Sequence, residues 1–108
     1  MEAPILAFTG DTCIDVVERE EVVRTAKVLV MEVTFFDDRV SVENARDKGH
    51  IHLDEVLDRA ELFDNEHILF THQSARYTHR EAEEICARRL PEGLRERVTV
   101  LGLPESLQ

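Results

Sequence analysis

The sequence predicts an α/β fold in one domain that spans residues 1–108. Short apolar runs of strand length alternate along the chain with segments in which apolar residues recur at helical spacing. This alternation is typical of structures in which helices are layered on a sheet. The length suits one compact domain and leaves no room for a second.

The first predicted strand is the apolar run 5–8, which a polar turn closes at residues 9–12. Residues 14–26 mix valines with an acidic run and predict a helix. The next strand, residues 27–33, is almost continuously apolar and rich in β-branched side chains. Such a strand is typically covered on both faces, as in a layered α/β sheet.

A short helix is predicted in the middle of the chain, where Ser41 can cap its first turn and Gly49 fits a left-handed exit. A second helical pattern begins at Asp54. Residues 67–71 form the third predicted strand.

The carboxyl-terminal part begins with a helix over residues 78–90, because Thr78 and Glu81 match a capping box. Pro91 ends this helix. Residues 98–101 are the fourth predicted strand, which we place at an edge of the sheet.

Charge restricts the partners of the chain. Asp and Glu total 23 against 13 Lys and Arg, so the formal net charge is −10. Such a surface repels phosphate backbones, and the chain alone should bind nucleic acid poorly. A nuclease would need metal ions, or a basic surface from another polypeptide.

Cys13 and Cys86 lie far apart and form no CxxC spacing, which argues against a disulfide scaffold and for a reducing compartment. The sequence shows no signal-peptide pattern and no apolar run near the roughly 20 residues that cross a bilayer. We therefore expect a cytoplasmic protein without a membrane partner.

Polar side chains come directly after three of the predicted strands: Asp11, Glu32 and His72. In layered α/β folds, a site is assembled at strand ends. Carboxylate oxygen and neutral imidazole nitrogen are both good zinc ligands. His50 and His52 lie in a loop before a helix, and from there they can reach over a neighbouring site.

Each candidate also has a structural explanation. Asp11 could form a turn or cap a helix. Glu32 could be solvated, and His72 could be a partly buried histidine with its hydrogen bonds satisfied. His50 and His52 could be surface loop residues. Patterns alone thus indicate an α/β domain with a candidate metal or acid/base site.

Four strings in this sequence have the order and spacing of ribonuclease Z: Gly10-Asp11-Thr12, Met31-Glu32-Val33-Thr34-Phe35, Gly49-His50-Ile51-His52 and Thr71-His72-Gln73-Ser74-Ala75-Arg76-Tyr77. From residue 5 to residue 101 the chain resembles the short, plant-type ribonuclease Z of the metallo-β-lactamase superfamily. The resemblance implies the carboxyl-terminal half of the αββα sandwich. That half is expected to be a mixed sheet of about four strands with helices mainly on one face.

The resemblance also implies an activity, the endonucleolytic removal of the 3′ trailer from precursor transfer RNA with two zinc ions. Asp11 is implied to bridge both ions, and His72 to bind one of them. Glu32 and His50 are implied to relay a proton to the leaving oxygen, which suits an acid/base pair. The two ions would polarise the scissile phosphate. His52 departs from the commoner His-Ser-Thr version of its loop.

One departure from the family is large. The main metal motif, His-x-His-x-Asp-His, occurs nowhere in this sequence, and the substrate-gripping arm is also missing. Asp11 and His72 are two ligands, whereas a catalytic zinc ion usually has three protein ligands and a water. We therefore expect weak or no zinc binding and no activity unless an upstream half supplies the remaining histidines.

Three functions stay open at this point. The chain is part of a ribonuclease Z-like phosphodiesterase, or a non-catalytic interaction domain derived from one, or a mononuclear metal protein that uses Asp11, His72 and His50. The sequence also predicts a homodimer. Residues 28–30 and 68–70 point apolar side chains to both faces of the sheet, but the helices suffice to cover mainly one face. A second copy would close the other face.

Overall fold

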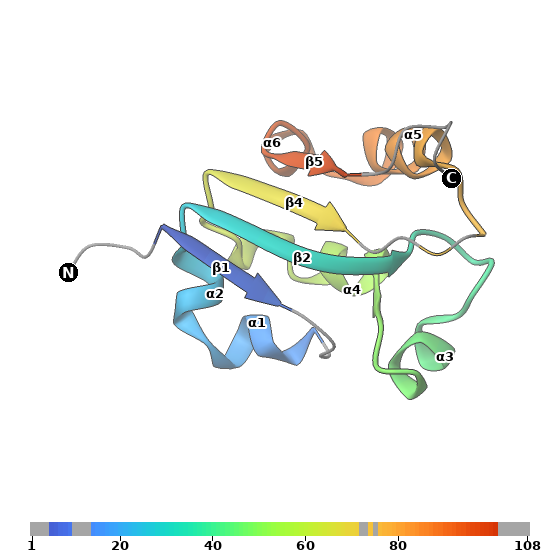
Figure 1. The fold of residues 1–108 in the computed structure, drawn as a ribbon, viewed down its shortest axis with the longest axis horizontal. Coiled ribbons are helices and arrows are strands. Elements are labelled where there is room, and N and C mark those ends of the chain that lie inside the picture. The colour runs from blue at the N-terminus through green and yellow to red at the C-terminus, as the bar shows by residue number, and fades with distance from the viewer. Residues whose placement is uncertain (1–4, 10–13, 72–73, 75, 102–108) are drawn as a thin grey trace.

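The computed structural model describes residues 5–9, 14–71, 74 and 76–101. Its sheet has five strands. Four of them lie in the order β1-β2-β4-β5, and the fifth, β3, pairs with the end of β2 that follows the residues paired with β1. Every pairing between these strands is parallel, and the arrows of β1, β2, β4 and β5 run in one direction in Figure 1. The strands are β1 Leu6–Thr9, β2 Val28–Phe35, β3 Ile51–His52, β4 His67–Thr71 and β5 Val98–Val100.

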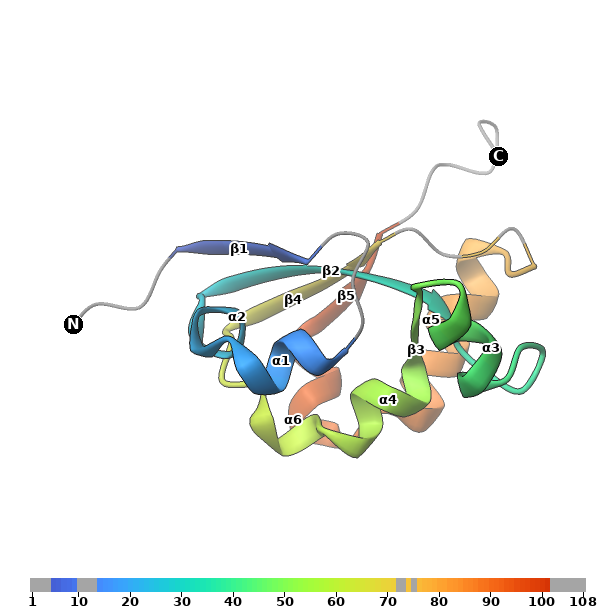
Figure 2. The same cartoon turned by 90° about the horizontal axis from the view of Figure 1, so that it is seen from below.

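The helices lie on one side of the sheet, which is seen edge-on in Figure 2. No helix in the described part of the chain is long and apolar enough to cross a membrane. The helices are α1 Asp15–Arg19, α2 Glu21–Thr25, α3 Val42–Asp47, α4 Leu53–Asp58, the 3₁₀ helix η1 Ala60–Leu62, α5 His79–Arg89 and α6 Glu92–Arg95.

The α/β class and the placement of the helices on one face are confirmed, and the architecture is compatible with half of a metallo-β-lactamase sandwich. The mixed sheet that we expected is a parallel one in the described residues. Parallel neighbours result because the connections between the paired strands carry helices that return the chain over the same face.

The helix predicted over residues 14–26 is divided in two. Glu20 has an extended backbone (φ −110°, ψ 105°) and separates α1 from α2. The break frees carbonyl groups at the end of α1, and Arg24 compensates by donating hydrogen bonds of 2.9 Å to the carbonyl oxygens of Val17 and Glu18. A side chain from the second helix therefore caps the first.

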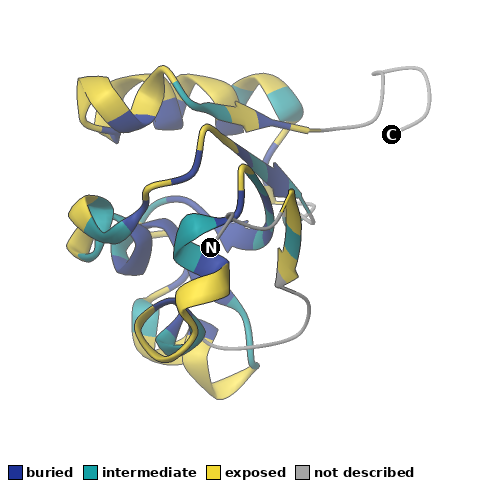
Figure 3. Cartoon of the chain, turned by 90° about the vertical axis from the view of Figure 1, so that its left-hand side faces the viewer, coloured by how far each residue is buried: buried dark blue, intermediate teal, exposed yellow. Residues whose placement is uncertain are grey.

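The core lies between the sheet and the helices. Alternate residues of β2 and β4, among them Leu29, Met31 and Phe70, are at most 1% exposed on this side. Within residues 5–9, 14–71, 74 and 76–101, no helix covers the opposite face. Leu6 and Phe8 of β1 are each 62% exposed there, and Figure 3 shows this strand at the margin of the molecule.

Candidate functional site

Three consecutive residues in the middle of β2 each pair with a different segment of the chain. Met31 pairs with Thr9 at the end of β1, Glu32 with Thr71 at the end of β4, and Val33 with Ile51 at the start of β3. Since β1 and β4 lie on opposite sides of β2, the segments meet around residues 31–33.

These segments are the ones that carry the predicted site residues. In sequence, Asp11 comes two positions after Thr9, His72 comes one after Thr71, and His50 comes one before Ile51. Asp11 and His72 themselves lie outside the described residues. Their roles as zinc ligands therefore stay predictions, while the ends of the strands that lead to them converge as the sequence suggests.

Glu32 is half-buried and lies on the face of the sheet that carries no helices. Its neighbours Met31 and Val33 are fully buried and point to the helix side, so the alternation of the strand turns Glu32 the other way. The carboxylate is thus presented at the point where the three segments meet.

His50 is held at the end of β2 by its backbone and by its ring. Gly49, with φ of 74°, makes the left-handed exit from α3, and the N–H of His50 donates to the carbonyl oxygen of Ala45 at 2.9 Å. The imidazole meets the Phe35 ring edge-on, with 5.8 Å between ring centroids. The half-buried imidazole is thus fixed next to the end of β2.

His52 does not reach over the site, and it is not a surface residue either, because only 1% of it is exposed. Its Nδ1 accepts the N–H of Asp54 at 3.0 Å and so caps α4. The proton is therefore assigned to Nε2, which donates to the carbonyl oxygens of Asp37 and Val40 at 2.8 and 2.9 Å. His52 holds the structure around the site together.

The carboxylate of Glu55, which is buried, contacts the backbone of His52. Glu55 accepts the backbone N–H of His52 at 3.2 Å, which completes a capping box. Its other oxygen accepts a hydrogen bond from Nη1 of Arg46 at 2.6 Å, and the same guanidinium donates to Asp15 at 3.0 Å. The segment that carries His50 is therefore bounded by α3 and α4, which the Arg46–Glu55 contact joins.

The structure adds Tyr77 and Asp37 to the residues that build this region. The Tyr77 hydroxyl donates to Oδ1 of Asp37 at 2.8 Å and accepts the N–H groups of Phe36 and Asp37 at 3.1 and 3.2 Å. One hydroxyl thus uses its donor and both acceptor positions. The sequence did contain a signal, because Tyr77 ends the Thr-His-x-Ser-x-Arg-Tyr string.

Burial and hydrogen bonding set the ionisation of this pair. Burial raises the pKa of Tyr77 above its usual 10.0. Burial also opposes ionisation of Asp37, but hydrogen bonds from the N–H of Arg39 and from Tyr77 outweigh it, and the pKa of Asp37 falls below its usual 3.8. At neutral pH the pair is a neutral phenol that donates to a carboxylate.

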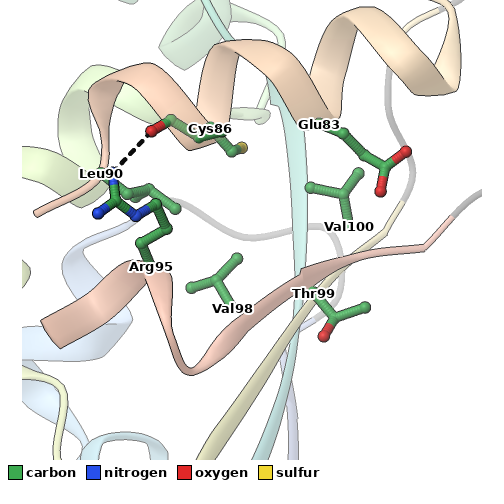
Figure 4. A pocket seen from close by; sticks show the side chains of 8 residues that line it. Glu83, Cys86, Leu90, Arg95, Val98, Thr99 and Val100 are labelled. Carbon is green, nitrogen blue, oxygen red and sulfur yellow. Dashed lines mark hydrogen bonds between the residues drawn. The ribbon is translucent and has the colours of Figure 1, made fainter. Parts of the chain in front are cut away.

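A cavity of about 230 Å³ lies between α5 and β5, with Cys86 in its wall (Figure 4). Burial raises the pKa of the Cys86 thiol to about 12, so at neutral pH this side chain is protonated and is not a ready nucleophile. Among the residues that the structure describes, no cluster of three or more His, Cys, Asp or Glu side chains could hold a metal ion.

The strand ends that meet at Glu32 belong to a chain with clear relatives. No family model matches the chain. It is 53% identical over 100 residues to tRNase Z TRZ1 of Arabidopsis thaliana, a match that covers 91% of this chain and 35% of that protein. It is 37% identical over 84 residues to tRNase Z TRZ2, chloroplastic, of the same plant, which covers 76% of this chain and 24% of that protein.

These matches confirm the resemblance that the four strings indicate, since both relatives are tRNase Z proteins. The chain spans about a third of the length of the first relative and about a quarter of the second, by the shares of 35% and 24%. The chain therefore belongs to the ribonuclease Z family.

Proposed function

We propose that the chain supplies part of the active site of a zinc-dependent phosphodiesterase that processes the 3′ ends of transfer RNA precursors. The convergence of three segments on residues 31–33 of β2 carries the proposal, because it gathers the neighbours of all four predicted site residues. The names of the two relatives support the substrate.

The transfer of a proton to the leaving oxygen is assigned to Glu32 and His50. Glu32 presents a half-buried carboxylate beside the ends of β1 and β4, and His50 presents an imidazole fixed against Phe35. A carboxylate and an imidazole at one site can together move a proton to the leaving oxygen. We assign the relay to these two side chains.

Zinc is assigned to Asp11 and His72, whose carboxylate and imidazole are donors that zinc accepts. When bound, the ions would polarise the scissile phosphate. Two protein ligands are fewer than a catalytic zinc ion needs, so we propose that the chain is inactive until an upstream half supplies histidines. A net charge of −10 also leaves RNA binding to that half.

The proposal is tested with a chimera in which this chain replaces the matching residues of Arabidopsis tRNase Z TRZ1. The chimera should remove the 3′ trailer from a precursor transfer RNA, and the 108-residue chain alone should not. A chimera that folds and binds precursor but leaves the trailer in place would refute the assigned function. Cleavage by the chain alone would refute the proposed need for an upstream half.

We further propose that the chain, by itself, forms a homodimer through the face that carries no helices. The register places Phe8, Val30 and Leu69 side by side on that face, and Leu6 lies beside Val28. Contiguous apolar surface of this kind is typically covered by a partner. A two-fold axis would bring the same row of side chains from a second copy onto it.

The same exposed face favours the second candidate function, a non-catalytic interaction domain. Both candidate functions would cover the exposed side chains of Leu6 and Phe8 with a partner, but only the phosphodiesterase needs Glu32 for its reaction. In the TRZ1 chimera, replacing Glu32 with Gln should lower the rate of cleavage by about 10²–10⁴-fold without changing the fold. A chimera that is indifferent to this replacement would favour the interaction domain.

A further inference from the structure

Three distant parts of the chain are hydrogen-bonded to residues 36–40, which connect β2 to α3 and which we call the anchor segment. Tyr77 comes from the connection between β4 and α5, His52 from the start of α4, and Arg89 from the end of α5. The anchor segment has no regular secondary structure of its own, so these side chains define its path.

Tyr77 fastens the β4–α5 connection to the anchor segment. Besides the three hydrogen bonds of its hydroxyl, its ring packs edge-on against Phe36, with 5.3 Å between centroids. The guanidinium of Arg39 lies over the Tyr77 ring, 4.6 Å from its centroid, and donates to the carbonyl oxygen of Arg76 at 2.9 Å. In the same connection, the N–H of Ser74 donates to the carbonyl oxygen of Thr34 at 3.0 Å.

His52 fastens the segment that carries His50. Its Nε2 bonds the carbonyl oxygens of Asp37 and Val40, so one buried imidazole closes the anchor segment over the start of α4. Residue 51 alone separates His52 from His50. Any shift of the anchor segment must therefore move His52, and with it the backbone of His50.

Asp37 is the point where these two attachments meet. Its side chain accepts from Tyr77, and its carbonyl oxygen accepts from His52. We propose that the anchor segment couples Tyr77 to His50, which makes Tyr77 and His52 positioning residues for His50. The inference rests on the proposed function for its catalytic consequence, but the coupling itself is a property of this chain.

The coupling is measured by amide hydrogen exchange on the 108-residue chain, with Tyr77→Phe as the main variant. Phe keeps the ring contacts with Phe36 and Arg39 and removes only the hydroxyl. We expect the protection of the Ser74 amide to fall at least about five-fold, and that of the His50 amide, which Tyr77 does not touch, to fall with it. The His50 ring signal should also move, because its edge-on contact with Phe35 changes.

Two further variants separate coupling from general weakening. His52→Thr keeps a side-chain oxygen that can cap α4 but is too short to hold both carbonyl oxygens, and it should lower the protection of Ser74 in return. Val98→Ala, at the opposite end of the sheet, should lower the protection of all core amides in the same proportion. It should leave the His50 ring signal in place.

The outcomes decide the inference. If Tyr77→Phe affects Ser74 but leaves His50 unchanged, or behaves like Val98→Ala, the anchor segment transmits nothing and the inference is wrong. In the TRZ1 chimera, both positioning variants should lower kcat at least about ten-fold at unchanged KM, since misplacement of a catalytic group by about 1 Å costs roughly 100-fold. If the exchange experiments show the coupling but the chimera is inactive, only the proposed function is refuted. If Tyr77→Phe loses the protection of His50 while the chimera with this replacement keeps its full kcat, the positioning role is refuted.

Discussion

Arg46 of α3 and Glu55 of α4 form an ion pair across the segment that carries His50, with 2.6 Å between Nη1 and the carboxylate oxygen. Glu55 is 3% exposed and also accepts the backbone N–H of His52, while Arg46 remains partly open to solvent and contacts Asp15 as well. The pair therefore joins two helices and the cap of the second.

Removing one partner of this pair should destabilise the chain more than removing both. Arg46→Met leaves a buried carboxylate without its cation, whereas Arg46→Met with Glu55→Gln leaves a neutral amide that can still accept from His52. Urea unfolding measures both variants. We expect the double variant to recover part of the stability that Arg46→Met loses, and additive losses would mean that the two side chains are not coupled.

The pH dependence of stability should report on Asp37. Because its pKa is lower in the folded chain than the usual 3.8, the ionised form stabilises the fold at neutral pH. That stabilisation is present above the unfolded pKa and is lost as the pH falls through the folded one. Asp37→Asn should be less stable at pH 7 and lose less stability on acidification, as thermal unfolding between pH 7 and 3 would show.

Glu81 serves as the matched control for this experiment. The hydrogen bond from Arg39 lowers the pKa of Glu81 too, but Glu81 is more open to solvent. Glu81→Gln should therefore change the acid limb less than Asp37→Asn does. An equal or larger change would assign the acid sensitivity to the exposed pair of Arg39 and Glu81 instead of Asp37.

Zinc binding by the chain alone should be weak, because Asp11 and His72 offer two ligands and a stable site usually has three or four. Calorimetry and elemental analysis on the purified chain should find no stoichiometric ion. One tightly held zinc ion per monomer, lost in Asp11→Ala, would contradict this count and favour the mononuclear metal protein.

Sedimentation at micromolar concentration should show a dimer that depends on the face without helices. Phe8→Glu places a charge among Val30 and Leu69 and should give a monomer. Val22→Glu is the matched control, because Val22 is also exposed, at 47%, but lies on α2. A wild-type monomer with cooperative unfolding, or a dimer that survives Phe8→Glu, would exclude this interface.

Much of the fold follows from local pattern. The apolar runs give β2 and β4, and capping residues place the starts of α3 and α5 at Ser41 and Thr78. The two-residue strand β3 was not predicted, since a pair such as Ile51 and His52 is too short to show a period. The division of the first helix at Glu20 depends on Arg24, whose contact with the end of α1 a helical pattern does not reveal.

The sequence names candidate site residues but not their arrangement, and the roles of Asp11, Glu32, His50 and His72 stay predictions. Strand order and register, which bring the neighbours of Asp11, His50 and His72 to Glu32, arise from pairings between distant segments. The hydrogen bond of Tyr77 to Asp37 spans 40 positions in the chain and has no local signal. His52 was misjudged because a buried histidine that caps a helix and a loop histidine at a site have the same local sequence.

The acid/base assignment is tested most directly by replacing Glu32 and His50 in the TRZ1 chimera. Glu32→Gln keeps the size of the side chain and removes its charge, and His50→Gln removes the ionisable ring. Each should lower kcat by about 10²–10⁴-fold, the usual contribution of a positioned acid or base, and leave precursor binding unchanged. Because the two side chains are assigned to one relay, the double variant should lose little more than either single variant.

The matched control is His67→Gln, at the far end of β4, which should keep the wild-type kcat. Losses that add in full would mean that Glu32 and His50 act separately, and a chimera that keeps its rate without His50 would remove that residue from the mechanism.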